Sequence, residues 1–124
     1  MRRVVITGAG TVNALAMDVP GTIAAMKEGR CGIGPLEFQD VDRLTVRIGA
    51  QIKGYEPEAH FNRQQIALFD RFTQFALLAA REAIGQAGLT FQGALADRSG
   101  VILGNSGGGL STLDDNYRTV YEEG

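Results

Sequence analysis

Few residues of this 124-residue chain have side chains suited to nucleophilic or acid–base chemistry. Cys31 is the single cysteine and His60 the single histidine, so a catalytic cysteine–histidine pair could only be these two. A nucleophilic thiolate is favoured by a helix N-terminus or a nearby cation. Cys31 instead follows the predicted end of a helix, where the dipole disfavours an anion, and only Arg30 is adjacent. We interpret Cys31 as a structural or incidental thiol and His60 as a solvent-exposed residue preceding a helix.

Two adjacent carboxylates, Asp114 and Asp115, could take part in metal binding or acid–base chemistry. The helix predicted over residues 110–123 has an apolar face made of Leu110, Leu113, Tyr117, Val120 and Tyr121. Both carboxylates then face solvent, and a charged face near a helix N-terminus explains them. A lone cysteine leaves no CxxC metal or redox site. These patterns predict no catalytic residue, no cofactor and no metal site within the chain.

The N-terminal segment VVITGAG has the strand–Gly-x-Gly order that opens a dinucleotide-binding fingerprint, in which glycines let a pyrophosphate approach a helix N-terminus. The third glycine of that fingerprint would fall at Asn13, and no helix begins at Gly10. The acidic residue expected about 20 positions on, after a second strand, is absent, because Asp40 and Asp42 precede that strand. Dinucleotide binding is a distant alternative to a tight strand exit at Gly8 and Gly10.

Composition and charge exclude several classes of protein. The net charge is −2 with both signs spread along the chain, so the basic stripe of a nucleic-acid-binding protein is absent. The longest apolar runs fall far short of the roughly 20 residues that cross a bilayer. Gly8 and Gly10 interrupt the first apolar run before it could form an export signal. We expect a cytoplasmic protein with no membrane or nucleic-acid partner.

Strands separated by helices are predicted along the chain. Residues 3–7 and 99–104 are short apolar runs ended by glycine, and residues 45–52 alternate in the manner of a half-buried strand. Glycine is abundant, at 17 of 124 residues or about twice the usual share, which points to turns and close backbone approaches. The pattern predicts an α/β layered fold with right-handed crossovers.

Two further helices are predicted with defined ends. One covers about residues 19–28, with Asp18 as its N-cap, Pro20 in its first turn and Gly29 as its stop. The other covers residues 65–87, and its apolar positions occupy well over half of its circumference. Its narrow solvent strip would consist of Asp70, Arg71, Gln74, Arg81, Glu82 and Gln86. We expect this long helix to be buried on several sides and to end at Gly88.

Taken in order, three segments resemble one family. RRVVITGAGTVNALA followed by KEGRCGIG, then FDRFTQFALLAAREAIGQAGL, then RSGVILGNSGGGLSTLDDNY are similar to the N-terminus of β-ketoacyl-[acyl-carrier-protein] synthases. The resemblance implies a thiolase-like fold, which is a layered α/β/α/β/α sandwich in the complete enzyme and normally a homodimer. It makes residues 1–124 a single incomplete domain, the first part of the N-terminal half, with the C-terminal half absent.

The family's reaction is a decarboxylative Claisen condensation between an acyl thioester and malonyl-carrier protein, carried out by a cysteine and two histidines. The resemblance implies that all three lie outside this chain, and that neither Cys31 nor His60 matches them. The chain alone is then expected to be inactive. The implied partner is acyl carrier protein, which delivers the acyl and malonyl thioesters. In FNRQQIALFD, where relatives often have several cations for that partner, Arg63 is the only lysine or arginine.

The resemblance also implies one substrate-binding segment. NSGGG, residues 105–109, would border the acyl tunnel, with Gly107 and Gly108 as substrate-binding residues. Several relatives have a bulky aliphatic residue at the position of Gly107, and its absence here would leave more room for an acyl tail. The alternative is that Gly107 only permits a tight strand-to-helix turn. For the whole chain, the alternative to a synthase portion is a non-catalytic synthase-like fragment or interaction subunit.

Overall fold

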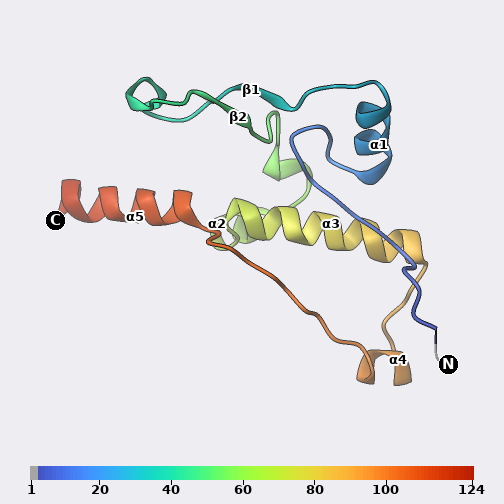
Figure 1. The fold of residues 1–124 in the computed structure, drawn as a ribbon. Helices are drawn as coiled ribbons and strands as arrows, with labels where there is room; N and C mark the ends of the chain where they lie inside the picture. The colour runs from blue at the N-terminus through green and yellow to red at the C-terminus, as the bar shows by residue number, and fades with distance from the viewer. Residues whose placement is uncertain (1–2) are drawn as a thin grey trace. The chain divides into compact units, whose positions relative to one another are not determined.

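The structure, a computed structural model, describes residues 3–124 (Figure 1). The described chain forms two compact units, one comprising the residues up to Glu56 with Phe75–Gly88, the other Pro57–Gln74 with Leu89–Gly124. Its helices are α1 (Val19–Lys27), α2 (Arg63–Leu68), α3 (Arg71–Ala87), α4 (Ala94–Asp97) and α5 (Leu110–Glu123). Its strands are β1 (Ile33–Pro35) and β2 (Ile48–Ala50), and short 3-10 helices lie at Val41–Arg43 and Pro57–Ala59. The helices and the small sheet are compatible with the predicted α/β class.

In the first unit, α1 confirms the predicted helix and its ends. Asp18 has an extended backbone, and its side chain accepts a hydrogen bond from the Gly21 N–H at 2.7 Å. Pro20 lies in the first turn, where its missing N–H has no cost. Gly29 follows the helix with φ of 67°, the left-handed conformation that glycine adopts without a Cβ penalty.

The sheet of the first unit is an antiparallel pair, in which Ile33 lies opposite Ala50 and Pro35 opposite Ile48. The strand predicted over residues 45–52 is thus confirmed at its centre. Its partner β1 was not predicted, because IGP lies in a glycine-rich connection with no strand pattern of its own. These two strands are antiparallel, whereas a right-handed crossover joins parallel strands. The predicted crossover is therefore wrong for the described sheet.

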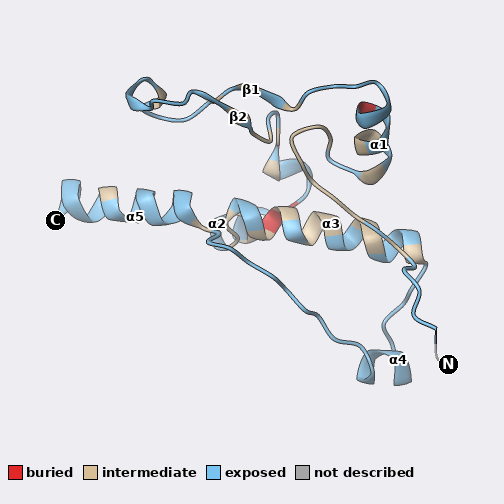
Figure 2. Cartoon of the chain, viewed as in Figure 1, coloured by how far each residue is buried: buried red, intermediate tan, exposed pale blue. Residues whose placement is uncertain are grey.

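The strands predicted over residues 3–7 and 99–104 are corrected by the structure: neither segment pairs with another among the described residues. Their apolar side chains are all exposed, with fractions from 70% at Leu103 to 100% at Ile102 (Figure 2). A β-branched run favours an extended backbone, but a strand also needs a neighbour to bond its N–H and C=O groups. That neighbour is a non-local requirement which the pattern of one segment does not contain.

The long helix predicted over residues 65–87 is in fact two helices. α2 starts at a capping box, in which Asn62 and Gln65 each bond the other's backbone N–H through their side chains. Phe69 then turns out of the helix with ψ of 115°. Asp70 directly precedes α3 and caps its start, because its Oδ1 accepts from the Phe72 N–H at 3.1 Å. The end is confirmed: Gly88 follows α3 with φ of 62°.

The expected burial of this helix is also corrected. The only α3 residue classed as buried is Gln74, which is 3% exposed, whereas Ile84 remains 41% exposed. Gln74 donates through Nε2 to the Phe69 carbonyl at 2.8 Å, so it satisfies the backbone at the break between α2 and α3. The predicted solvent strip therefore includes side chains that bond to the protein itself.

Candidate functional site

In the first unit, two glycines near the N-terminus lie directly against the backbone of α3. A Cβ built on Gly8 would overlap the carbonyl oxygen of Ala83, and one on Gly10 would overlap that of Ala79. Both positions require glycine, because any side chain would force the segment away from the helix. In Figure 1 the blue N-terminal segment crosses the C-terminal part of α3, where these contacts occur.

The same segment is bonded to two polar side chains of α3. The carboxylate of Glu82 accepts from the Thr11 N–H at 2.9 Å and from the Val19 N–H, at the start of α1, at 2.7 Å. Gln86 accepts from the Ala9 N–H at 2.6 Å. The N–H groups of Ala9 and Thr11, which a dinucleotide pyrophosphate would need as donors, are therefore already bonded to α3 side chains. One of their acceptors is a carboxylate, which would repel a pyrophosphate. The geometry argues against the dinucleotide-binding alternative and explains the glycines structurally.

The sequence did not identify Glu82 and Gln86 as structural residues, since both lie on the strip assigned to solvent. A signal was present: an acid and an amide four residues apart share one helix face. The two glycines that let the N-terminal segment approach α3, Gly8 and Gly10, lie more than 60 positions earlier in the sequence. The pairing of the two features depends on the fold and not on either segment alone.

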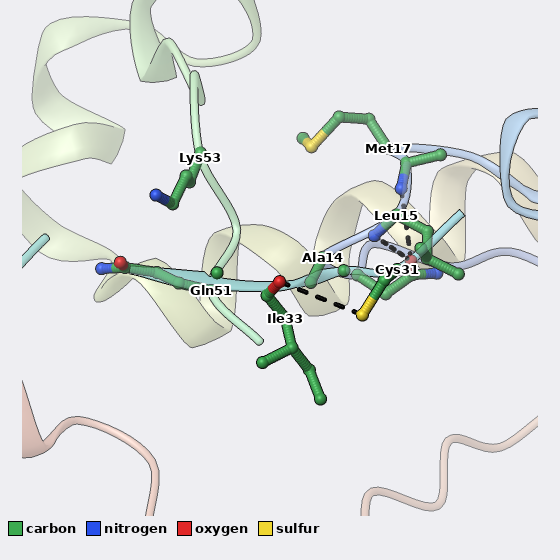
Figure 3. Close-up of a pocket in the computed structure, with 11 residues that line it drawn as sticks. Ala14, Leu15, Met17, Cys31, Ile33, Gln51 and Lys53 are labelled. Atoms are coloured by element: carbon green, nitrogen blue, oxygen red, sulfur yellow. Dashed lines mark hydrogen bonds between the residues drawn. The ribbon is translucent and has the colours of Figure 1, made fainter. Parts of the chain in front are cut away.

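A hollow of about 460 Å³ lies beside Cys31 in the first unit (Figure 3). Cys31 is exposed, and its Sγ makes only a long contact of 3.9 Å to the Ile33 carbonyl oxygen. Arg30 pairs with Glu28 at 2.8 Å, and Lys53 donates to Glu37 at 2.6 Å. The neighbouring cations are thus paired with carboxylates. The arrangement supports the structural or incidental interpretation of Cys31.

The other side chains considered from the sequence are all at the surface. His60 is exposed and belongs to the second unit, whereas Cys31 belongs to the first. Asp114 forms an i,i+4 ion pair with Arg118 at 3.0 Å, which accounts for it as a surface residue of α5. Arg63 is the exposed first residue of α2. No group of three potential metal ligands occurs among residues 3–124, and no helix there is long and apolar enough to cross a membrane.

In the second unit, residues 105–109 form a glycine-rich loop that leads into α5. Asn105 stabilises its turn, because its Oδ1 accepts from the Gly108 N–H at 3.0 Å. Gly107 has φ of 90° and Gly109 has φ of 84°, so both adopt conformations that side-chain-bearing residues avoid. A Cβ at Gly107 would meet nothing within 4 Å, whereas one at Gly108 would lie 2.7 Å from the ring of Phe72. The two residues therefore have different surroundings.

Two residues at the start of α3 hold this loop. Phe72 lies against Gly108, and Asp70 accepts a hydrogen bond through Oδ2 from the hydroxyl of Thr112 in the first turn of α5. None of these three contact residues was assigned to the site from the sequence, and Asp70 was placed on the solvent strip. Thr112 lies 42 residues after Asp70, so no local pattern links it to the start of α3.

Residues 1–124 match the family described as "Beta-ketoacyl synthase, N-terminal domain". "Nodulation protein E" of Rhizobium sp. (strain N33) is 43% identical over 123 residues, which cover 99% of this chain and 30% of that protein. "3-oxoacyl-[acyl-carrier-protein] synthase 2" of Staphylococcus aureus (strain N315) is 33% identical with the same coverage. The protein of that name from Synechocystis sp. is 32% identical. The chain spans about 30% of the length of these relatives, and it belongs to the β-ketoacyl synthase family, matching the family's N-terminal domain over its whole length.

Proposed function

We propose that this chain is the N-terminal portion of a 3-oxoacyl-[acyl-carrier-protein] synthase. The complete protein condenses an acyl thioester with malonyl-carrier protein by decarboxylative Claisen chemistry, in fatty-acid or polyketide synthesis. The observation that carries the proposal is the family match over the whole chain, together with relatives named as such synthases. The nucleophilic cysteine and the two histidines belong to the remaining sequence, so the chain alone is inactive.

The exposed apolar segments support a role as part of a larger body. Val4, Ile6, Val101 and Ile102 are each at least 93% exposed, and such side chains are normally covered. In the proposed thiolase-like sandwich, residues 3–7 and 99–104 become strands when neighbouring strands supply their hydrogen bonds. The complete enzyme is a cytoplasmic homodimer in this proposal, and acyl carrier protein presents its substrates. Two of the relatives carry that carrier in their names.

Gly107 and Gly108 are the proposed substrate-binding residues. The open space around the Cβ position of Gly107 supports this role, because an acyl tail passing there would meet no side chain of the loop. Gly108 contributes differently, since its missing Cβ is what lets the Phe72 ring lie against the loop. The loop therefore has open space at Gly107 and contacts the Phe72 ring at Gly108.

A non-catalytic synthase-like subunit is the second candidate, and the same exposed apolar segments favour it if no further sequence follows. The first experiment is the intact mass of the polypeptide in its native host, followed by a condensation assay with acyl- and malonyl-carrier protein. A chain several times heavier than 13.2 kDa that consumes malonyl-carrier protein agrees with the proposal. A product of 13.2 kDa, or a longer product that neither decarboxylates nor condenses, refutes it.

A further inference from the structure

The first turn of α3 contacts the glycine-rich loop at residues 105–109 through an aromatic ring. Three ring carbons of Phe72 lie 2.7–2.8 Å from the position that a Gly108 Cβ would occupy, and another lies 3.6 Å from that of Gly109. Those distances leave no room for a side chain at Gly108. Its φ is not in the left-handed region, so the ring and not the backbone conformation is the reason for glycine there.

A carboxylate joins the same two elements beside that ring. The two oxygens of Asp70 have separate partners: Oδ1 accepts from the Phe72 N–H at 3.1 Å, and Oδ2 accepts from the Thr112 hydroxyl. Thr112 is the third residue of α5, and Phe72 is the second residue of α3. A single anion therefore lies at two helix N-termini, where the helix dipoles favour negative charge. This fixes the start of α5 relative to the start of α3.

The other side of the loop has no such support. A Cβ at Gly107 would meet nothing within 4 Å, although Gly107 is the residue next to Gly108. Asn105 closes the turn from within the loop and makes no bond to α3. The position of Gly107 in space is therefore set through Gly108 and α5, and those in turn depend on Phe72 and Asp70.

We infer that Asp70 and Phe72 are positioning residues that set which acyl lengths the complete enzyme accepts, by fixing the loop that carries Gly107. The inference rests on the proposed function, because the acyl tunnel is part of that proposal. Neither residue touches the acyl chain. Loosening their contacts lets the loop shift and changes the preference between short and long acyl groups, while the chemistry elsewhere in the enzyme is untouched.

The test uses Thr112→Val in the complete polypeptide, since valine has the shape of threonine but cannot donate to Asp70. Thr119→Val is the matched control, because Thr119 lies on the same helix and donates only to the Asp115 carbonyl at 3.1 Å. Thr112→Ser restores a hydroxyl. The measured quantity is the ratio of kcat/KM for hexanoyl- and hexadecanoyl-carrier protein. A loss of folded enzyme lowers both values equally and leaves this ratio unchanged.

We expect Thr112→Val to change the ratio on the order of fivefold, the effect of one net hydrogen bond, with Thr112→Ser and Thr119→Val close to wild type. In the same variants, amide exchange at Leu113, whose N–H bonds the Gly109 carbonyl, should quicken by a similar factor only in Thr112→Val. Exchange that matches the Thr119→Val control overturns the inference even if the enzyme has no activity. A faster exchange with an unchanged ratio also overturns it.

Failure of the proposed function looks different from failure of this inference. If wild-type protein condenses neither acyl group, the proposed function is wrong, and the exchange data still decide whether Asp70 fixes the loop. A second pair of variants addresses Phe72 directly. Gly108→Ala should disturb the loop through a clash with the ring, and Phe72→Leu should relieve that disturbance in the double variant. Additive effects on the selectivity ratio would contradict the contact.

Discussion

Glu82 offers a quantitative prediction, because one carboxylate bonds two separate parts of the backbone. It accepts from Thr11 at 2.9 Å and from Val19 at 2.7 Å, and both bonds join residues more than 60 positions apart. In Glu82→Gln, one oxygen becomes an NH₂ group that faces a backbone N–H. At least one of the two donors then loses its acceptor. The substitution preserves size and helix propensity, so the lost bonds are the main change.

The magnitude follows from the kind of bond. A hydrogen bond to a charged group contributes about 1.5–3 kcal/mol net, and the partly exposed site places this one near about 2 kcal/mol. We therefore expect the opening of α1 from α3 to become about 30-fold more frequent, at 1.36 kcal/mol for each factor of ten. The assay is amide exchange of the complete polypeptide, resolved at Thr22, whose N–H bonds the Asp18 carbonyl at 3.1 Å.

Glu28→Gln provides the matched control, because Glu28 is the C-cap of α1, the helix at which exchange is measured. Its carboxylate pairs only with Arg30, and both side chains are more than half exposed, so the loss is expected to be below about 1 kcal/mol. Exchange at β1 and β2 should remain unchanged in both variants. The reasoning is refuted if Glu82→Gln and Glu28→Gln have the same exchange at Thr22, since the two bonds to Glu82 would then contribute nothing to holding α1.

Three further outcomes are expected. Gly8→Ala should lower the free energy of unfolding by more than about 2 kcal/mol, because its Cβ would overlap the Ala83 carbonyl. In the control Gly34→Ala, the new Cβ meets nothing within 4 Å, so the free energy of unfolding should stay within about 0.5 kcal/mol of wild type. Equal urea midpoints for the two variants would contradict this prediction. Gly107→Ile in the complete enzyme should shift the acyl-length profile more than Gly107→Ala does. The alanine variant measures only the backbone cost of a side chain at φ of 90°. Identical acyl-length profiles for the two variants would contradict a role of Gly107 in the acyl pocket. Cys31→Ser should keep condensation within about twofold of wild type, because the nearby cations Arg30 and Lys53 are paired with carboxylates. Loss of acyl loading in that variant would instead make Cys31 a nucleophile.

Features that depend on a few neighbouring residues were predictable from the sequence. Asp18 and Gly29 delimit α1 as expected, since a cap side chain and a left-handed glycine act within one helical turn. Gly88 ends α3 for the same reason. The break at Asp70 is also local, yet it was missed: the apolar spacing continues through the break, so periodicity outweighed an aspartate that prefers the N-cap.

Features that depend on distant residues were not predictable. The apolar patterns of residues 3–7 and 99–104 favour strands, but pairing requires a second segment that the described residues do not supply. Gly107 and Gly108 were named through the family resemblance and remain proposals. Their difference in surroundings depends on Phe72, which is 36 residues away from Gly108. No pattern within either segment encodes that contact.

One physical solution recurs in the two units. In each, a short apolar segment ends in a glycine-rich loop, and the loop lies against α3 where a Cβ would overlap it, at Gly8 in the first unit and at Gly108 in the second. A carboxylate of α3 or its cap, Glu82 or Asp70, then bonds the start of the helix that follows the loop. Glycine alone would leave such a loop mobile, and the carboxylate alone could not bring it close enough. Gly8 and Gly108 and the two acids of the predicted solvent strip, Glu82 and Asp70, thus have a common role within each unit, which is to attach a loop closely to α3 residues.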